Sequence, residues 1–342
     1  MSTSKRNRMS RATRRRVAWT VAGMLLLLMA ALLSLALGSR QIPPAQVFDA
    51  LLHGGTGDNA QVVRALRVPR TVIGVMVGLA LAVAGVVMQG ITRNPIAEPG
   101  VLGVSQGASL GVVCAIAFLG VHSPAGYVWF AFAGAGLAAV AAYAVAGSGR
   151  GGASPVKLAL AGAAMNAFIA SIVSAIVTTD ARALDEFRFW DVGSIGGRDG
   201  DVVAQTWPFV LVGLLLVAVV ARGLDALALG DDVARGLGHR VALLRAVGAL
   251  AATVLTGVAV AVAGPIAFVG LAVPHIARAL VGADHRWVLA LSALLGPTVI
   301  LVSDVLGRVL FAPSEVPVAV MTALLGVPFL VALVRRKATV PA

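Results

Sequence analysis

Few side chains in this 342-residue chain could carry chemistry, and the most conspicuous is a carboxylate inside an apolar run. Asp304 is the only acidic residue well inside such a run, and Arg308 follows it by four residues. A carboxylate in an apolar segment is a candidate for proton transfer, because an unpaired charge is costly to bury there. Four-residue spacing also lets two opposite charges pair on one helix face. We favour an ion pair over a proton relay at this position.

Other polar residues in or beside apolar runs have both a structural and a functional interpretation. Glu98 lies between two prolines, where organising the backbone is favoured over catalysis. His275 and Arg278 lie near the end of a short run, where they could cap a helix or contact a partner. Gln89 and Asn166 would be penalised in hydrocarbon unless paired. Helix–helix hydrogen bonds and a polar pathway both fit these two residues.

Motifs that bind nucleotides or catalytic metals are absent from the sequence. There is no Gly-rich phosphate loop ending in Gly-Lys-Ser or Gly-Lys-Thr, no Gly-x-Gly-x-x-Gly that opens a helix after a strand, and no His-Glu-x-x-His. Cys114 is the only cysteine, which excludes an intramolecular disulfide and a thiolate metal cluster. We therefore expect neither enzymatic activity nor a bound cofactor in this chain.

Membrane-spanning helices must position these residues, because 59% of the chain is hydrophobic and only 12% is charged. A bilayer core of about 30 Å requires about 20 helical residues. The apolar runs do not alternate as barrel strands would, so an all-α membrane protein is expected. The first run is too long for a signal-peptide core of about 7–15 residues. About ten spans are predicted: 17–37, 70–91, 100–120, 127–146, 158–179, 202–221, 241–263, 266–281, 287–310 and 317–334.

The 27 Lys and Arg residues indicate how the spans are oriented. A basic tail, 1–16, precedes the first span, and three basic residues follow the last one. Because basic loops stay in the cytoplasm, both termini are expected there, and ten spans place nineteen of the 27 basic residues on that side. This distribution explains the net charge of +12 without nucleic-acid binding. We expect one transmembrane domain, 17–335, and a second cytoplasmic tail, 336–342.

Two spans contain related runs of small residues. GLALAVAG at 78–85 and GVAVAVAG at 257–264 are identical at six of eight positions. The runs lie five spans apart, so they cross the membrane in opposite directions, as an inverted repeat requires. Small residues also allow close helix packing without any repeat. Both interpretations remain open.

The connection 222–245 is too short and too charged to span, and it lies on the predicted cytoplasmic side. Two aspartates suit a helix N-terminus, a glycine suits its end, and three aliphatic residues recur at four-residue spacing. These are Asp231 and Asp232, Gly238, and Leu229, Val233 and Leu237. The aspartates would be repelled by an anionic membrane surface. We therefore expect a short amphipathic helix that docks into a cytosolic partner.

A second long connection, 180–201, lies on the opposite side and contains three aromatic residues among charged ones. Aromatic residues at this depth are common anchors at the membrane interface. A short helix that gates the outer mouth of a pathway is the alternative.

Several segments, taken together and in order, carry a resemblance to a known family. They are 67–70 (RVPR), 89–105 (QGITRNPIAEPGVLGVS), 189–194 (FWDVGS), 229–238, 264–278 (GPIAFVGLAVPHIAR), 284–286, 303–304, 317 and 326–329. With these motifs the chain resembles the FecCD-type permeases of ABC importers, which carry iron–siderophore complexes, haem or cobalamin across the bacterial inner membrane.

The resemblance implies a ten-span permease that works beside a second permease, which is another copy or a homologue. Two cytosolic ATPase subunits would bind the ATP and Mg²⁺, and an extracytoplasmic substrate-binding protein would dock on the outer side. A ferric siderophore is the expected cargo, with haem and cobalamin as alternatives. The implied location is the plasma (inner) membrane of a bacterium.

The resemblance also assigns three sets of residues. ATPase coupling is assigned to Leu229, Gly230, Asp231, Asp232, Val233, Ala234, Arg235, Leu237 and Gly238. Docking of the binding protein is assigned to Arg67, Arg70 and Arg308. Candidates for lining the pathway are Asn166, Ser171, Ser174 and Thr322.

Two other classes of membrane protein fit the sequence less well than an importer permease does. A secondary transporter driven by an ion gradient would need several carboxylates or histidines inside the membrane, and Asp304 alone is poor support. A purely structural membrane scaffold would not need a helix for docking a cytosolic partner.

Overall fold

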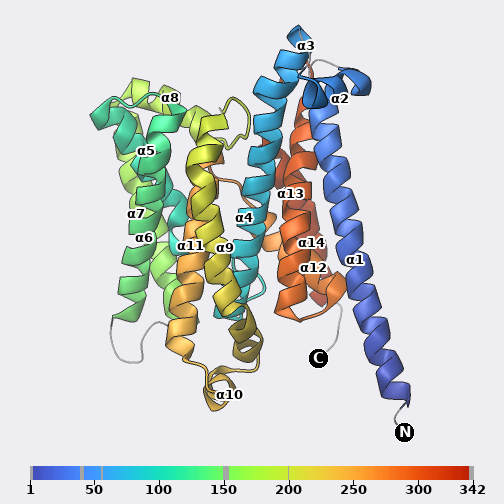
Figure 1. Cartoon of the computed structure of the whole chain (residues 1–342). Coiled ribbons are helices and arrows are strands. Elements are labelled where there is room, and N and C mark those ends of the chain that lie inside the picture. Colours follow the sequence, from blue (N-terminus) through green and yellow to red (C-terminus); the bar gives the residue numbers. More distant parts are fainter. Residues whose placement is uncertain (1–2, 39–41, 55–56, 149–153, 199, 339–342) are drawn as a thin grey trace.

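The computed structural model describes residues 3–38, 42–54, 57–148, 154–198 and 200–338, and these are helical with no strand (Figure 1). The helices of the first half are α1 (Thr3–Ala36), α2 (Pro44–Leu52), α3 (Asp58–Gln61), η1 (Val62–Arg67), α4 (Val68–Thr92), η2 (Pro99–Leu102), α5 (Val104–Leu119), α6 (Pro124–Gly147) and α7 (Pro155–Thr179). Those of the second half are α8 (Ala181–Asp191), α9 (Gly200–Ala228), α10 (Asp231–Gly236), α11 (Val241–Ala263), α12 (Val269–Val281), α13 (His285–Val309) and α14 (Val318–Ala338).

The predicted membrane helices are confirmed. Seven stretches in the described residues are long and apolar enough to cross a membrane, and they lie in α1, α3 to α4, α6, α7, α9, α11 and α13. The shorter apolar helices α5, α12 and α14 complete the predicted ten. Several boundaries differ from the prediction: α1 continues into the basic tail, helical residues precede Arg70, and α9 continues to Ala228. A helix can extend past the apolar run, because only its apolar part must fit the bilayer.

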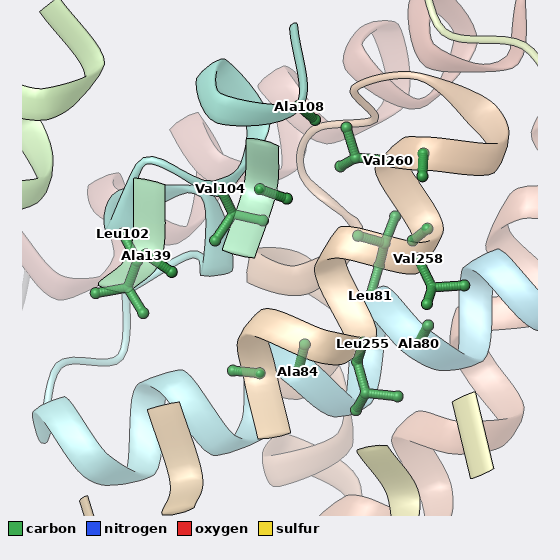
Figure 2. Close-up of a cluster of buried hydrophobic side chains, with 14 of the residues drawn as sticks. Ala80, Leu81, Ala84, Leu102, Val104, Ala108, Ala139, Leu255, Val258 and Val260 are labelled. Atoms are coloured by element: carbon green, nitrogen blue, oxygen red, sulfur yellow. The ribbon is translucent and has the colours of Figure 1, made fainter. Parts of the chain in front are cut away.

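Helices α4 and α11 form the centre of the bundle. In the most apolar 18-residue stretch of the span that contains α4, 83% of the residues are buried, compared with 17% in that of α1. Helix α4 is therefore surrounded by other helices. Small residues make this possible, because a Cβ atom added to Gly85 of α4 would lie 1.9 Å from the carbonyl oxygen of Gly270 in α12. Figure 2 shows Ala80 and Leu81 of α4 with Leu255 and Val258 of α11 in one buried cluster.

The same order of helices occurs twice. A long helix rich in small residues, a break, a short helix and two further helices follow one another as α4 to α7 and again as α11 to α14. Helix α4 runs away from the end of the bundle that carries α3, and α11 runs back from the end that carries α10 (Figure 1). The two sets are thus antiparallel, which supports the inverted-repeat interpretation of the two small-residue runs.

The bundle has two ends, and the site residues gather at both. Helices α2, α3 and α8 lie at one end, which we call the α8 end, and α10 lies at the other, which we call the α10 end (Figure 1).

Candidate functional site

The segment around α10 forms the predicted short helix with an exposed apolar face. Gly230 before the helix and Gly238 after it both have positive φ, 108° and 85°, which glycine adopts without strain. Leu229, Val233 and Leu237 are exposed, while Ala234 is fully buried against the bundle. The segment therefore presents three aliphatic side chains to its surroundings and is held from its other face.

Asp231 holds this segment to the centre of the bundle. Its Oδ1 lies 2.8 Å from Nη2 of Arg245 in α11 and 3.6 Å from Nη2 of Arg93, which follows α4. Asp232 only pairs with Arg235 within the helix, at 2.7 Å on the surface. The sequence suggested the same N-terminal role for both aspartates. Packing gives the two aspartates different roles. Within the described part of the chain, Asp231 pairs with arginines of other segments, whereas Asp232 pairs within α10.

Asp304 forms the predicted ion pair with Arg308 and a second one with Arg70. The Asp304 carboxylate lies 2.9 Å from Nη2 of Arg308 and 2.8 Å from Nη2 of Arg70, and Nε of Arg70 also donates to it. Nη1 of Arg70 pairs with Glu315 at 2.7 Å. The buried acid is thus neutralised from two helices, which confirms the structural interpretation of the Asp304–Arg308 spacing.

Arg67 and Arg308 hold the end of α1. Nη1 of Arg67 donates to the carbonyl oxygens of Leu35 and Ala36 at 2.8 and 2.7 Å. Nη1 of Arg308 donates to the carbonyl oxygen of Leu37 at 2.9 Å. The last carbonyls of a helix lack intrahelical partners and carry partial negative charge, so cationic side chains stabilise this end. Both arginines are buried, so neither projects freely from the α8 end.

The three predicted docking arginines nevertheless line one hollow of about 250 Å³ at the α8 end. Arg198 and Glu315 line the same hollow and were not identified from the sequence. Nε of Arg198 and Nε of Arg308 are buried there without a hydrogen-bond partner among the described residues. We call this the arginine hollow. Its four arginines outnumber Glu315 in the lining and Asp304, which pairs with Arg70 and Arg308 behind it, so the hollow is electropositive.

The predicted pathway residues are not brought together within one chain. Ser171 and Ser174 are exposed on α7, whereas Thr322 of α14 is buried and donates to the carbonyl oxygen of Ala319 at 2.9 Å. Asn166 is half-buried and donates to the carbonyl oxygen of Gly100 at 3.3 Å. In Figure 1, α7 lies at the left edge of the bundle, and α14 lies apart from it, beside α12 and α13.

Gln89 and Arg278 join the two helices α4 and α12. Nε2 of Gln89 donates to the carbonyl oxygens of Gly270 and Leu271, both at 3.3 Å, and its Oε1 accepts from Nη1 of Arg278. Because lipid offers no hydrogen-bond partners, a buried amide in the membrane must pair with protein groups, and Gln89 does so between two helices. It also gives Arg278 a partner within the bundle.

Glu98 organises the break before α12. Its Oε1 accepts a hydrogen bond from the amide of Phe268, which has φ of 70° and begins that helix. Burial raises the pKa of the Glu98 carboxyl above its usual range, and the Phe268 amide acts in the opposite direction. The backbone-organising role predicted for Glu98 is confirmed.

Comparisons with known proteins agree with this architecture. The model of the FecCD transport family matches residues 26–336. The chain is 43% identical over 318 residues to the iron(3+)-hydroxamate import system permease protein FhuB of Bacillus subtilis (strain 168), covering 93% of this chain and 83% of that one. It is 42% identical over 314 residues to the ferric enterobactin transport system permease protein FepD of Escherichia coli (strain K12), covering 92% and 94%.

A solved structure shares the fold. It is described as an inward-facing conformation of a metal-chelate type ABC transporter, and it is 29% identical to this chain with a TM-score of 0.80, covering 93% of this chain and 98% of that one. The family model spans nearly all of the helical bundle, and both relatives are permease proteins matched over most of their length. The chain therefore belongs to the FecCD transport family.

Proposed function

We propose that this chain is the permease subunit of an ABC importer for ferric siderophores in the plasma (inner) membrane of a bacterium. The proposal rests on two surfaces at opposite ends of the bundle. One is the exposed apolar segment at the α10 end, and the other is the electropositive arginine hollow at the α8 end. The two relatives act on iron(3+)-hydroxamate and ferric enterobactin by name, which favours a ferric chelate. Haem and cobalamin are the alternative cargoes.

The α10 segment is proposed to dock into a cytosolic ATPase that binds ATP and Mg²⁺. Leu229, Val233 and Leu237 supply apolar surface that a groove in the partner would cover. Asp231 ties the segment to α4 and α11, so movement of the partner would be passed to the two central helices. This end of the bundle would face the cytoplasm, together with both termini.

The arginine hollow is proposed to receive an acidic side chain of an extracytoplasmic binding protein. A carboxylate in this hollow would meet a lining that holds four arginines, Arg67, Arg70, Arg198 and Arg308. Electrostatic complementarity of this kind fixes the orientation of a partner. Because Arg70 and Arg308 also hold Asp304, charge reversal of these arginines would disturb the fold. The acidic residues of the partner should therefore be changed first.

The pathway is proposed to form between two permease subunits, this chain and a second copy or homologue. Exposed residues of α7 are mostly alanine, serine and threonine, unlike the large aliphatic residues exposed on α1. Small residues suit a close helix contact or a polar pathway. Since α7 and α14 lie apart in Figure 1, exposed residues of the two helices are proposed to face each other across the pair of subunits.

Reconstitution tests the proposal. Proteoliposomes would contain this chain with its ATPase subunits, and uptake of a ferric hydroxamate, ferric enterobactin, haem and cobalamin would be measured with the binding protein present. ATP-dependent uptake of a ferric siderophore is expected. Uptake driven by an ion gradient without ATP would favour a secondary transporter and overturn the proposal.

Cross-linking tests the paired pathway separately. Ser174→Cys on α7 and Ala323→Cys on α14, each in the Cys114→Ser background, would be combined in native membranes. A disulfide between two permease subunits is expected, and a functional importer that contains a single permease subunit would exclude the pair.

A further inference from the structure

Helices α6 and α11 do not close on each other along their whole length. A groove of about 490 Å³ runs between them and is lined almost entirely by apolar side chains. On α6 the lining residues include Phe132, Gly136 and Tyr143, and on α11 they include Ala246, Ala249 and Leu250. Their spacing of three, four and seven residues places each set on one helix face.

The corresponding contact in the other half of the bundle is closed. In the repeated order of helices, α4 and α13 occupy the places of α11 and α6. There a Cβ atom added to Gly78 would lie 2.5 Å from the backbone of Pro297, and one added to Gly296 would lie 2.2 Å from the carbonyl oxygen of Gly78. By contrast, a Cβ atom added to Gly136 would meet nothing within 4 Å. The groove is therefore a local gap rather than a consequence of using small residues.

Something apolar must fill this space in the membrane. An empty groove would leave its lining without dispersion contacts on one side. Water is a poor occupant, because Thr253 and the hydroxyl of Tyr143 are the only polar side-chain groups of the lining.

The dimensions select a single extended chain over a helix. From Phe132 to Tyr143 a helix rises by about 17 Å, and a groove of about 490 Å³ holds less than the volume of a helix of that length with its side chains. A helix with its side chains is about 10–12 Å across and would not fit. A length of about 17 Å is close to half of the hydrocarbon core of about 30 Å, which is one leaflet.

The rims and one end of the groove suit a lipid. Leu137 and Val140 on α6 and Leu243 on α11 are large, aliphatic and exposed, whereas the residues exposed on α7 are mostly small or polar. The groove ends about a turn from the last residues of α6, with Tyr143 at that depth, where its amphipathic ring suits the membrane interface. Arg240, immediately before α11, is exposed at the same end.

We propose that this groove binds one acyl chain of a phospholipid, whose anionic headgroup lies at the α10 end beside Arg240. The lipid would fill a gap between α6 and α11 that is absent where α4 and α13 pack backbone to backbone. This proposal concerns the bundle itself and does not depend on the cargo or on the proposed partners.

Native mass spectrometry of the purified full chain with added phosphatidylglycerol tests the proposal. Gly136→Leu would fill the groove from α6, and Ala249→Leu would repeat the test from α11. Ala133→Leu is the matched control, because Ala133 is exposed on the same helix and does not line the groove. We expect the wild type and Ala133→Leu to retain one tightly bound phosphatidylglycerol, and each groove variant to need at least tenfold more lipid for the same occupancy.

Three outcomes would overturn the proposal. One is equal retention of lipid by the wild type and by folded groove variants whose thermal unfolding matches that of Ala133→Leu. Another is a disulfide between Gly136→Cys and a second protein subunit in native membranes, which would show that protein covers the groove. A preference for phosphatidylglycerol over phosphatidylcholine that persists in Arg240→Gln would remove the headgroup from this position.

Discussion

The two ends of α4 are each held by one aspartate placed between two arginines, but the two clusters differ in their exposure to solvent. At the α8 end, Asp304 is 1% exposed and lies within 2.9 Å of both Arg70 and Arg308. At the α10 end, Asp231 is 24% exposed, and although Arg245 lies at 2.8 Å, Arg93 is 43% exposed and lies at 3.6 Å. The same combination of charges is buried and tight at one end and partly solvated and loose at the other.

This difference in exposure determines which end of α4 can move. Breaking a buried ion pair leaves an uncompensated charge in a medium of low dielectric constant, which is strongly unfavourable. A partly exposed pair can exchange its partner for water at little cost. We infer that the Asp304 cluster is a fixed anchor of α4, whereas the Asp231 cluster can rearrange when a partner moves α10. The four substitutions below test this inference, in order of their expected effect on stability.

Asp304→Asn should have the largest effect on stability. The substitution leaves the buried charge of Arg308 without its carboxylate and weakens the hold on Arg70. We expect a loss of about 3–5 kcal/mol of unfolding free energy, measured by thermal and denaturant unfolding in detergent. Unfolding that matched the wild type would show that the cluster does not anchor α4.

Asp231→Asn should have an intermediate effect. An asparagine keeps one hydrogen-bond acceptor for Arg245 but removes the negative charge. We therefore expect the unfolding free energy to fall by about 1–2 kcal/mol. In the importer, this variant should lose more of its ATP-dependent uptake than its stability predicts, because α10 would no longer be tied to the central helices. Uptake that fell only in proportion to the amount of folded protein would argue against a coupling role.

Leu237→Asp should leave the stability of the bundle within about 0.5 kcal/mol, because the side chain is already exposed. If α10 docks into an ATPase, a charge on its apolar face should weaken that complex at least tenfold, as measured by co-purification and by uptake. Leu237→Met, which keeps the side chain apolar, is the matched control and should keep both ATPase binding and uptake. Normal ATPase binding by Leu237→Asp would remove this face from the interface.

Asp232→Asn should have the smallest effect. Asp232 is 97% exposed, and among the described residues its ion pair is with Arg235, three residues away. Surface pairs of this kind contribute little, so unfolding should match the wild type within error. A large loss of stability would mean that the two aspartates of α10 are equivalent, which contradicts the comparison with Asp231.

Local patterns in the sequence determined most of the architecture. Lipid offers no hydrogen bonds to the backbone, so each apolar run of sufficient length must become a helix, and nearly every predicted span did so. The short helix at α10 and the Asp304–Arg308 pair were also predictable, because their residues lie within two helical turns of one another.

Only the tertiary structure decided which distant residues meet. The pairing of Arg70 with Asp304 joins residues 234 positions apart, and the contacts of Asp231 with Arg93 and Arg245 join three separate segments. Such contacts depend on which helices become neighbours and how closely their small residues let them approach, and no spacing along one helix encodes this. For the same reason, the sequence does not reveal that α4 and α13 close on each other at Gly78 whereas a groove opens between α6 and α11 beside residues 246–254.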